Sequence, residues 1–183
     1  MWTWCFRSAG YTAFRIDARC GSQVLLDVPG KEFDGVIGCD YFSVYHKYRG
    51  FCDCAVQFSF AHLIRDIRCL NEHASGYTKG WATGLLDSIR KLFAVIHRRE
   101  ELGDQFAGEL EDAPMQVRCN ATKRVSAGKK AYNLAKRFAD HGEAYLKFPT
   151  TPGLEPTNNL AEQANRFVVI DRKVPQGSKS ETG

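Results

Sequence analysis

An aspartate ends a short apolar run at residues 35–40, Gly-Val-Ile-Gly-Cys-Asp. Such a run is typical of a buried strand, and a strand delivers its last side chain to the edge of its sheet. In α/β folds that edge is where sites gather, so the carboxylate of Asp40 is a candidate for acid–base or metal chemistry. An aspartate at this place also serves as a helix N-cap or turn residue, and the run alone does not choose between these roles.

A second acid, Glu162, lies in the segment Glu-Pro-Thr-Asn-Asn-Leu-Ala-Glu-Gln-Ala-Asn-Arg at residues 155–166. Asn158 and Asn159 precede it, and Arg166 follows one helical turn later. Carboxylate and amide oxygens suit a hard divalent cation, and an arginine beside them suits phosphate. The structural alternative is a capping box, in which Asn159 caps a helix and Glu162 reaches back to it.

Two further groups have residue types that can do chemistry. His62 and Arg65 are three residues apart and share one face of a predicted helix, where both can point at a phosphate; the alternative is a half-buried histidine beside a surface arginine. Cys52 and Cys54, with His46 nearby, fit zinc, although this pattern lacks a second spaced pair of ligands. The seven cysteines are odd in number and irregularly spaced, which argues for reduced thiols rather than a disulfide framework.

Strands are expected first among the elements that position these residues. Two aromatic and β-branched runs separated by Ser-Ala-Gly predict a hairpin, Ser22 caps a short helix, and two buried strands follow. The predicted ranges are strands at 2–7 and 12–16, a helix at 22–28, and strands at 35–40 and 55–60.

Helical periodicity begins after Ala61 and dominates to about His141. We expect Pro114 to break the acidic stretch before it. The last predicted elements are an amphipathic helix at 129–140, a loop at 148–156 and a helix at 159–170. We therefore divide the chain into a β-rich part at 1–60, a helical insertion at 61–147, and a C-terminal part at 148–183. This order suits an α/β domain with a helical insertion.

The composition is that of a globular protein: 183 residues, 44% of them hydrophobic and 25% charged, which argues against a disordered or fibrous chain. The sequence has no apolar stretch near the roughly 20 residues of a membrane span and no secretory signal, so we expect a cytoplasmic protein without a membrane partner. A net charge of +4 does not by itself imply nucleic acid. Basic residues do gather in clusters, which either hold phosphates or form solvated helix faces.

Four segments together resemble the transposases of the IS66 family. They are Gly38–Tyr45, Ala61–Asp66, Ile96–Glu100 and Glu155–Val174, and with them the resemblance covers nearly the whole chain. It implies a ribonuclease-H-like fold, a mixed sheet with a helical insertion, whose three acids bind two Mg²⁺ ions for cleavage and strand transfer in DNA transposition. It also implies as partners the transposon ends and target DNA, further copies of the chain, and accessory proteins of the element.

The resemblance assigns roles to particular residues. Asp40 matches the family's second acid and Glu162 its third, so both are expected to be catalytic and to bind the metal. The residues expected at DNA phosphates are His62, Arg65, Asn158, Asn159, Arg166, Arg172 and Lys173.

The chain also departs from the family pattern. The family's first Asp comes from a strand upstream of the hairpin, and neither Asp17 nor Asp27 matches it. Ser59 precedes Phe60 where the family usually has a cysteine, and Asn165 stands where leucine is common. We therefore expect a fragment truncated at both ends, which lacks the first, central strand and shows little or no catalysis. Two other functions stay open: a non-catalytic DNA-binding module and a zinc-stabilised interaction domain.

Overall fold

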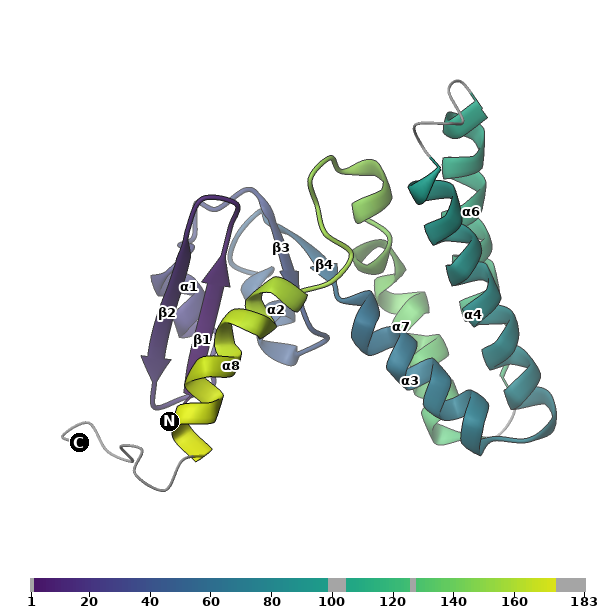
Figure 1. The fold of residues 1–183 in the computed structure, drawn as a ribbon, viewed down its shortest axis with the longest axis horizontal. Helices are drawn as coiled ribbons and strands as arrows, with labels where there is room; N and C mark the ends of the chain where they lie inside the picture. The colour runs from purple at the N-terminus through teal and green to yellow at the C-terminus, as the bar shows by residue number, and fades with distance from the viewer. Residues whose placement is uncertain (1, 99–104, 126–127, 174–183) are drawn as a thin grey trace. The chain divides into compact units, whose positions relative to one another are not determined.

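The chain folds into two compact units. The computed structural model describes residues 2–98, 105–125 and 128–173, and Figure 1 traces their helices and strands. The first unit joins residues 1–56 to residues 157–183, and the second unit is residues 57–156. The first unit is therefore built from both ends of the sequence. Its strands and the helices of both units confirm the α/β class.

The first unit opens with the predicted hairpin. Strands β1 (Trp2–Arg7) and β2 (Thr12–Asp17) pair antiparallel. The hydroxyl of Ser8 closes the turn, because it accepts hydrogen bonds from the backbone N–H groups of Gly10 and Tyr11, both at 3.3 Å. Serine is favoured in turns for this reason.

Short elements complete the first part of this unit. Helix α1 (Gln23–Asp27) is followed by strand β3 (Val36–Cys39), helix α2 (Ser43–Tyr48) and strand β4 (Ala55–Phe58). The last two residues of β4, Gln57 and Phe58, already belong to the second unit. Strands β3 and β4 form a two-stranded sheet separate from the hairpin. Two-stranded sheets are marginal alone, so both need a shared core.

That core is a cluster of buried side chains from the hairpin, the two short helices and the turn before β4. Its members are Trp4, Val24, Leu25, Val44, Tyr48 and Cys54. Burial of a large apolar side chain contributes about 1.5–3 kcal/mol, so these side chains stabilise elements that are too short to stand alone.

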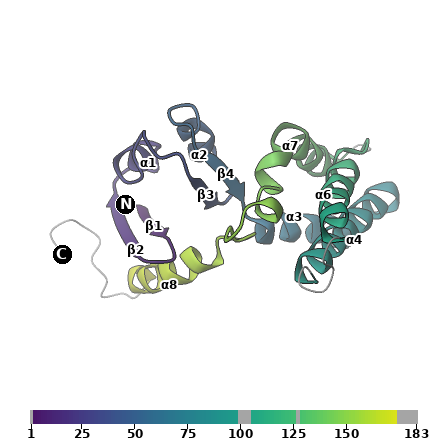
Figure 2. The ribbon, with the colours of Figure 1, turned by 90° about the horizontal axis from the view of Figure 1, so that it is seen from above.

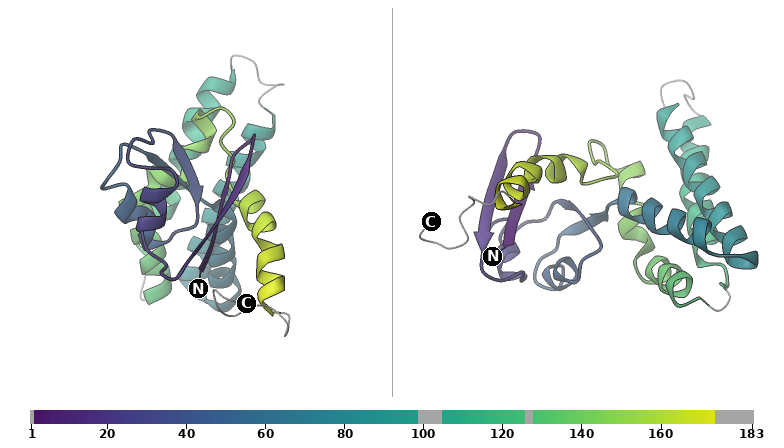
Figure 3. Two further views of the ribbon diagram at one scale, coloured as in Figure 1. Left: turned by 90° about the vertical axis from the view of Figure 1, so that its left-hand side faces the viewer. Right: turned by 60° about the horizontal axis from the view of Figure 1, so that its bottom comes forward.

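Helix α8 (Asn159–Lys173) returns the chain to the first unit. It contacts β1 and lies along the hairpin in Figures 2 and 3. The guanidinium Nη1 of Arg7, at the end of β1, donates to the backbone oxygen of Leu160 at 3.5 Å. Hairpin and helix are thus tied near the point where α8 begins.

The second unit is helical. Its elements are α3 (Phe60–His73), α4 (Gly76–His97), α6 (Gln105–Thr122), α7 (Lys129–Tyr145) and the 3₁₀ turn η1 (Phe148–Thr150). Helix α4 packs on both α3 and α6, and α6 packs on α7. None of the helices in the described ranges is both long and apolar enough to cross a membrane.

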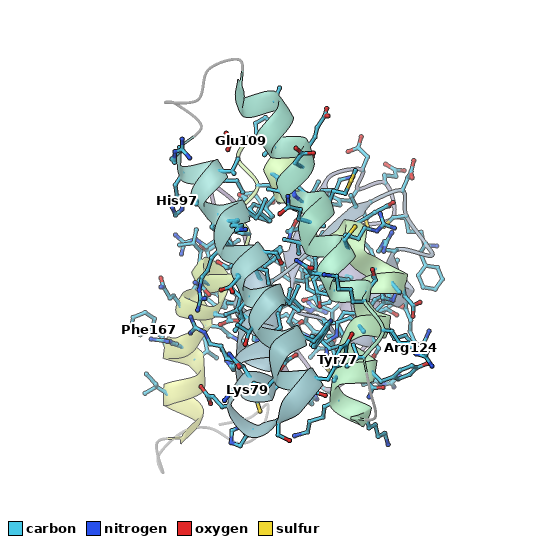
Figure 4. The ribbon with its side chains drawn as sticks, turned by 90° about the vertical axis from the view of Figure 1, so that its right-hand side faces the viewer. Tyr77, Lys79, His97, Glu109, Arg124 and Phe167 are labelled. Carbon is cyan, nitrogen blue, oxygen red and sulfur yellow. The ribbon has the colours of Figure 1, made fainter. Side chains whose placement is uncertain are left out.

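Helices α4 and α6 run antiparallel. Figure 4 shows Tyr77 and Arg124 at one end of the pair and His97 and Glu109 at the other. The indole Nε1 of Trp81 donates to the backbone oxygen of Asn120 at 2.9 Å, so the start of α4 is fixed to the end of α6.

Aromatic rings fill the centre of the second unit. Phe60 is fully buried, and its ring centroid lies 5.8, 6.1 and 5.3 Å from those of Phe93, Tyr145 and Phe148. Edge-to-face pairs of this kind add about 0.5–1.5 kcal/mol to simple burial. The unit therefore has a well-packed core of its own.

Two predicted boundaries are wrong. Strand β4 ends at Phe58 rather than at residue 60, because Phe60 begins α3 and its N–H donates to the backbone oxygen of Pro156 at 2.9 Å. Pro114 does not break a helix but lies inside α6. A proline in a helix interior costs about 3 kcal/mol, and burial of Val117 and Ala121 on the same helix offsets that cost.

Candidate functional site

A pocket of about 350 Å³ in the first unit contains both predicted acids. Asp40 is the residue directly after β3, and Glu162 lies in the first turn of α8. Although 121 residues separate them in sequence, both line this pocket, which we call the Asp40–Glu162 pocket. Both residues are exposed to solvent.

Asp40 stands at the end of its strand as predicted. It is not the N-cap of α2, because that helix begins at Ser43 and Phe42 occupies the cap position. Burial, and then the charge of Asp40, raise the pKa of the Cys39 thiol, and the same two causes raise the pKa of Cys20. The negative charge of Asp40 thus acts on neighbours within the pocket.

Glu162 is one residue too far along α8 for a capping box. The helix begins at Asn159, and the N–H of Glu162 donates to the backbone oxygen of Asn158 at 3.1 Å. Asn158 is therefore the cap residue, and the capping-box position three residues later is Ala161.

One face of α8 forms a wall of the pocket. Asn158, Ala161, Glu162 and Asn165 line it, and spacings of three and four residues place them on the same side of a helix. The Oδ1 atoms of Asn158 and Asn165 are buried without a hydrogen-bond partner. A buried polar atom left unpaired costs about 1–3 kcal/mol, so a polar ligand in the pocket would find acceptors already desolvated.

The opposite side of the pocket borders two strand edges. Consecutive residues of β1 (2–5) and of the β3 end (38–40) line it. Because successive side chains of a strand point to opposite faces, a lining of consecutive residues borders the strand's edge. Within the described residues, β1 pairs with β2 and β3 pairs with β4, so the edges facing the pocket carry no further strand.

The pocket has part of the donor set that a divalent cation needs. Carboxylates of Asp40 and Glu162, with the unpaired amide oxygens of Asn158 and Asn165, are hard oxygen donors, the type that Mg²⁺ and similar ions take. In the described ranges, however, no group of three His, Cys, Asp or Glu side chains is placed to share an ion. These residues fit a metal ion and do not supply a third acid.

The other predicted phosphate-binding residues are spread over both units. Asn159 and Arg166 are exposed on α8, and Arg172 and Lys173 lie in its last turn, with side chains outside the described part of the structure. His62 and Arg65 lie in α3 of the second unit; His62 is half-buried and Arg65 exposed. The Asp40–Glu162 pocket thus contains Asn158 and neither His62 nor Arg65.

Trp4, Tyr45 and Asn165 are among the residues of the pocket that sequence reasoning missed. Trp4 lines it with a buried, unpaired Nε1. Tyr45 lines it too, and burial, then the charges of Cys39 and Asp40, raise its pKa. Asn165 was noted only as a departure, although its spacing from Asn158 and Glu162 is that of one helix face. No local signal marks Trp4 or Tyr45.

The structure does not support a zinc site at Cys52 and Cys54. They supply two thiols, and no described residue joins them in a group of three metal ligands. The ring of His46 packs edge-on against Tyr41, with centroids 5.0 Å apart. A structural zinc ion takes four ligands.

Comparison with known proteins gives one match. The sequence model of the family described as "Transposase IS66 family" matches residues 1–183, which include both units. No curated protein and no solved structure matches the chain.

Proposed function

The chain belongs to the IS66 family of transposases, and we propose that its first unit is a catalytic core for DNA cleavage and strand transfer. Membership implies a role in transposition, and hence contact with DNA. One observation carries the finer proposal: Asp40 and Glu162, far apart in sequence, line the same pocket.

The proposed core is ribonuclease-H-like, with the helical second unit as an insertion that begins within β4 and ends before α8. The chain order supports this, since a hairpin and an acid-bearing strand precede the helical unit and an acid-bearing helix follows it. The edges of β1 and β3 that face the pocket have unused backbone hydrogen-bonding groups. One more strand beside them would join the two small sheets into a single mixed sheet.

Asp40 and Glu162 are the proposed metal ligands. Divalent metal, when bound, supplies Lewis-acid stabilisation of the attacking and leaving oxygens of a phosphodiester. The two carboxylates lower the electrostatic cost of bringing cations together beside an anionic backbone. Asn158 and Asn165 would accept hydrogen bonds from bound water or complete the oxygen ligands.

Phosphate contacts are proposed for the cationic and polar residues near these acids. Arg166 lies four residues after Glu162 and is exposed on α8, so its guanidinium can pair with a phosphate. Asn159, Arg172 and Lys173 belong to the same helix and are assigned this role through the family motif. His62 and Arg65 are assigned the same role through the motif that they share with the family.

Metal binding tests the proposal directly. We expect Asp40→Asn and Glu162→Gln each to weaken Mn²⁺ binding by about 10-fold or more, since each removes a charged ligand. Asp53→Asn is the matched control, because Asp53 is exposed in the same unit and does not line the pocket. Isothermal titration of the full chain measures the affinities. Equal affinity in all four proteins would contradict the proposed site.

Catalysis by this chain alone should be low. Among the described lining residues the acids are Asp40 and Glu162, and a two-metal centre of the family's kind uses three. We expect little nicking of supercoiled DNA with Mg²⁺ or Mn²⁺. Robust nicking that Asp40→Ala abolishes would show that two acids suffice, and robust nicking that survives Asp40→Ala would remove Asp40 from the mechanism.

A non-catalytic DNA-binding module is the second candidate. It is favoured by the exposed cations of the second unit, Arg65, Arg68, Arg90, Lys91, Lys123, Lys129 and Lys130. Arg90 is partly neutralised by Asp87, 2.6 Å away. DNA binding that falls steeply with salt, yet ignores Mg²⁺ and Asp40→Ala, would support this function over the first.

A further inference from the structure

Two thiols in the turn before β4 lie almost at bonding distance. The Sγ atoms of Cys52 and Cys54 are 2.7 Å apart, and both cysteines are free. A disulfide bond is about 2.04 Å long. In an extended strand the side chains of an i, i+2 pair share one face but lie roughly 6.6 Å apart. The backbone bends at Cys52 and Asp53, which brings the two thiols closer together than a strand would.

The two thiols differ in their surroundings. Cys54 is 7% exposed and belongs to the buried core cluster, whereas Cys52 is half-buried. The Sγ of Cys52 also lies 3.5 Å from the backbone oxygen of Tyr48, to which its thiol can donate. Solvent therefore reaches Cys52 first, while Cys54 is held behind it by the core.

We propose that Cys52 and Cys54 form a peroxide-sensitive dithiol that converts reversibly into an intramolecular disulfide. The oxidant is a small peroxide such as hydrogen peroxide. The dithiol is a modification site separate from the proposed DNA chemistry, because neither cysteine lines the Asp40–Glu162 pocket.

The conversion balances in two steps. The Cys52 sulfur, after losing its proton to solvent, attacks one peroxide oxygen; an S–O bond forms, the O–O bond breaks, and the hydroxide released takes up a proton to become water. The Cys54 sulfur then attacks the Cys52 sulfenic acid; an S–S bond forms, the S–O bond breaks, and the hydroxide leaves as a second water with the Cys54 proton. The two thiols lose two electrons and two protons, and the peroxide becomes two waters.

The order of the two steps follows from burial. Burial, and then the hydrogen bond and charge of Cys52, raise the pKa of Cys54 to about 12. A thiol that stays protonated is a poor attacker of dilute peroxide from solvent. Cys54 can still attack the sulfenic acid of Cys52, because the two Sγ atoms are held 2.7 Å apart and this proximity compensates for the low thiolate fraction. Cys52 is thus the peroxide-reactive residue, and Cys54 is the resolving residue.

The ring closed by this bond contains few residues. A short loop loses little entropy on cross-linking, so the bond adds little stability to the folded chain. A reductant such as dithiothreitol should therefore open it readily, as expected of a labile rather than a structural disulfide.

Thiol mapping after peroxide treatment of the reduced full chain tests the proposal. After denaturation and alkylation, the wild type should show two fewer alkylated cysteines, and the peptide containing Cys52 and Cys54 should be about 2 Da lighter than the same peptide with two unmodified thiols. Dithiothreitol should restore both sites. The matched controls are Cys69→Ser and Cys119→Ser, since both residues are exposed on helices of the second unit, and neither change should affect the Cys52–Cys54 bond.

A trapping experiment separates the two roles. In Cys54→Ser, the sulfenic acid of Cys52 has no resolving thiol, so dimedone should label Cys52 strongly; in the wild type this label should be nearly absent. Cys52→Ser should leave Cys54 unoxidised, and it serves as the second variant if Cys54→Ser does not fold. Full alkylation of both cysteines after peroxide treatment, or sulfinic acid at Cys52 without any cross-link, would overturn the proposal.

Discussion

The two units treat their buried polar groups differently. In the second unit, Gln57 is 1% exposed and its amide is fully used: Nε2 donates to the backbone oxygens of Phe58 and Tyr145, both at 2.8 Å, and Oε1 accepts from the N–H of Phe148 at 2.9 Å. Ser59 Oγ is the one unpaired buried side-chain atom among the described residues of that unit. Nearly all described buried side-chain polar atoms of the helical unit thus have a hydrogen-bond partner.

Among the described residues, the first unit has more buried side-chain polar atoms without a hydrogen-bond partner. Its buried unpaired atoms are Trp4 Nε1, Asn158 Oδ1 and Asn165 Oδ1, and all three residues line the Asp40–Glu162 pocket. Such atoms are rare in a folded interior unless something else binds them. The difference leaves unpaired polar atoms around the pocket of the first unit, whereas nearly all described buried side-chain polar atoms of the second unit are paired.

The two units also differ in how many large apolar side chains they expose. Of the fourteen large apolar side chains that are exposed in the described residues, eleven lie in the first unit. They include Tyr11, Phe14 and Ile16 of the hairpin. Apolar surface of this kind marks an interaction face or a tendency to associate.

Removal of the central ring of the second unit should have the largest effect. We expect Phe60→Ala to lower the free energy of unfolding by about 3–5 kcal/mol, because it leaves a cavity among three aromatic neighbours. Tyr132→Ala is the control, since Tyr132 is 60% exposed and should change stability by about 0.5 kcal/mol or less. Urea unfolding followed by circular dichroism measures both. Equal losses would show that this unit has no specific core.

Exchange of polar groups for apolar ones tests the contrast itself. Gln57→Leu should cost about 2–4 kcal/mol, because it leaves buried backbone groups of Tyr145 and Phe148 unpaired. Asn165→Leu should cost less than about 1 kcal/mol, because the amide oxygen that it removes has no partner. The same urea titration compares them. A larger cost for Asn165→Leu would mean that the pocket's polar atoms are satisfied after all.

Alkaline pH should affect the first unit before the second. Burial raises the pKa of Cys39, Tyr45 and Cys54, all in the first unit. In the unfolded chain these groups ionise near their ordinary pKa values. Their contribution to the free energy of unfolding is therefore fully present below about pH 9 and is lost as the pH rises toward 12. In the variant Trp81→Phe, the remaining tryptophans are Trp2 and Trp4, which both lie in the first unit. Tryptophan fluorescence of this variant therefore reports the unfolding of the first unit.

A matched variant sharpens this test. Cys39→Ala removes one of the titrating groups and should reduce the loss of stability between pH 9 and pH 12. Fluorescence and circular dichroism that change together across this range, with no effect of Cys39→Ala, would contradict the assignment of the alkaline sensitivity to the first unit.

Local patterns in the sequence predicted most of the elements. The hairpin at Trp2–Arg7 and Thr12–Asp17, the strand before Asp40 and the helix from Asn159 each have a periodicity or turn signal within a few residues, and each is confirmed. The family resemblance added the pairing of Asp40 with Glu162, which the pocket supports and local periodicity does not predict.

The failures have a common physical cause. The sequence predicts that Pro114 breaks the acidic stretch before it, but the packing of α6 against its neighbours outweighs the local cost of a proline inside the helix. Phe60 has the β-propensity of a strand residue, yet its place in the aromatic core puts it at the start of a helix. Trp4 and Tyr45 could not be assigned to the pocket because only the tertiary fold brings β1 and α2 beside α8.

The return of α8 to the first unit has a consequence for synthesis. During translation the hairpin and β3 emerge before residues 57–156, whereas α8 follows them. At about 5–20 residues per second, an intervening stretch of this length delays α8 by roughly 5–20 s. The helical unit holds its own core and is complete in sequence before α8 appears, so it can fold within that interval. Until then, the surface of the hairpin that α8 later covers stays exposed on the nascent chain. A chaperone could bind that surface during this interval.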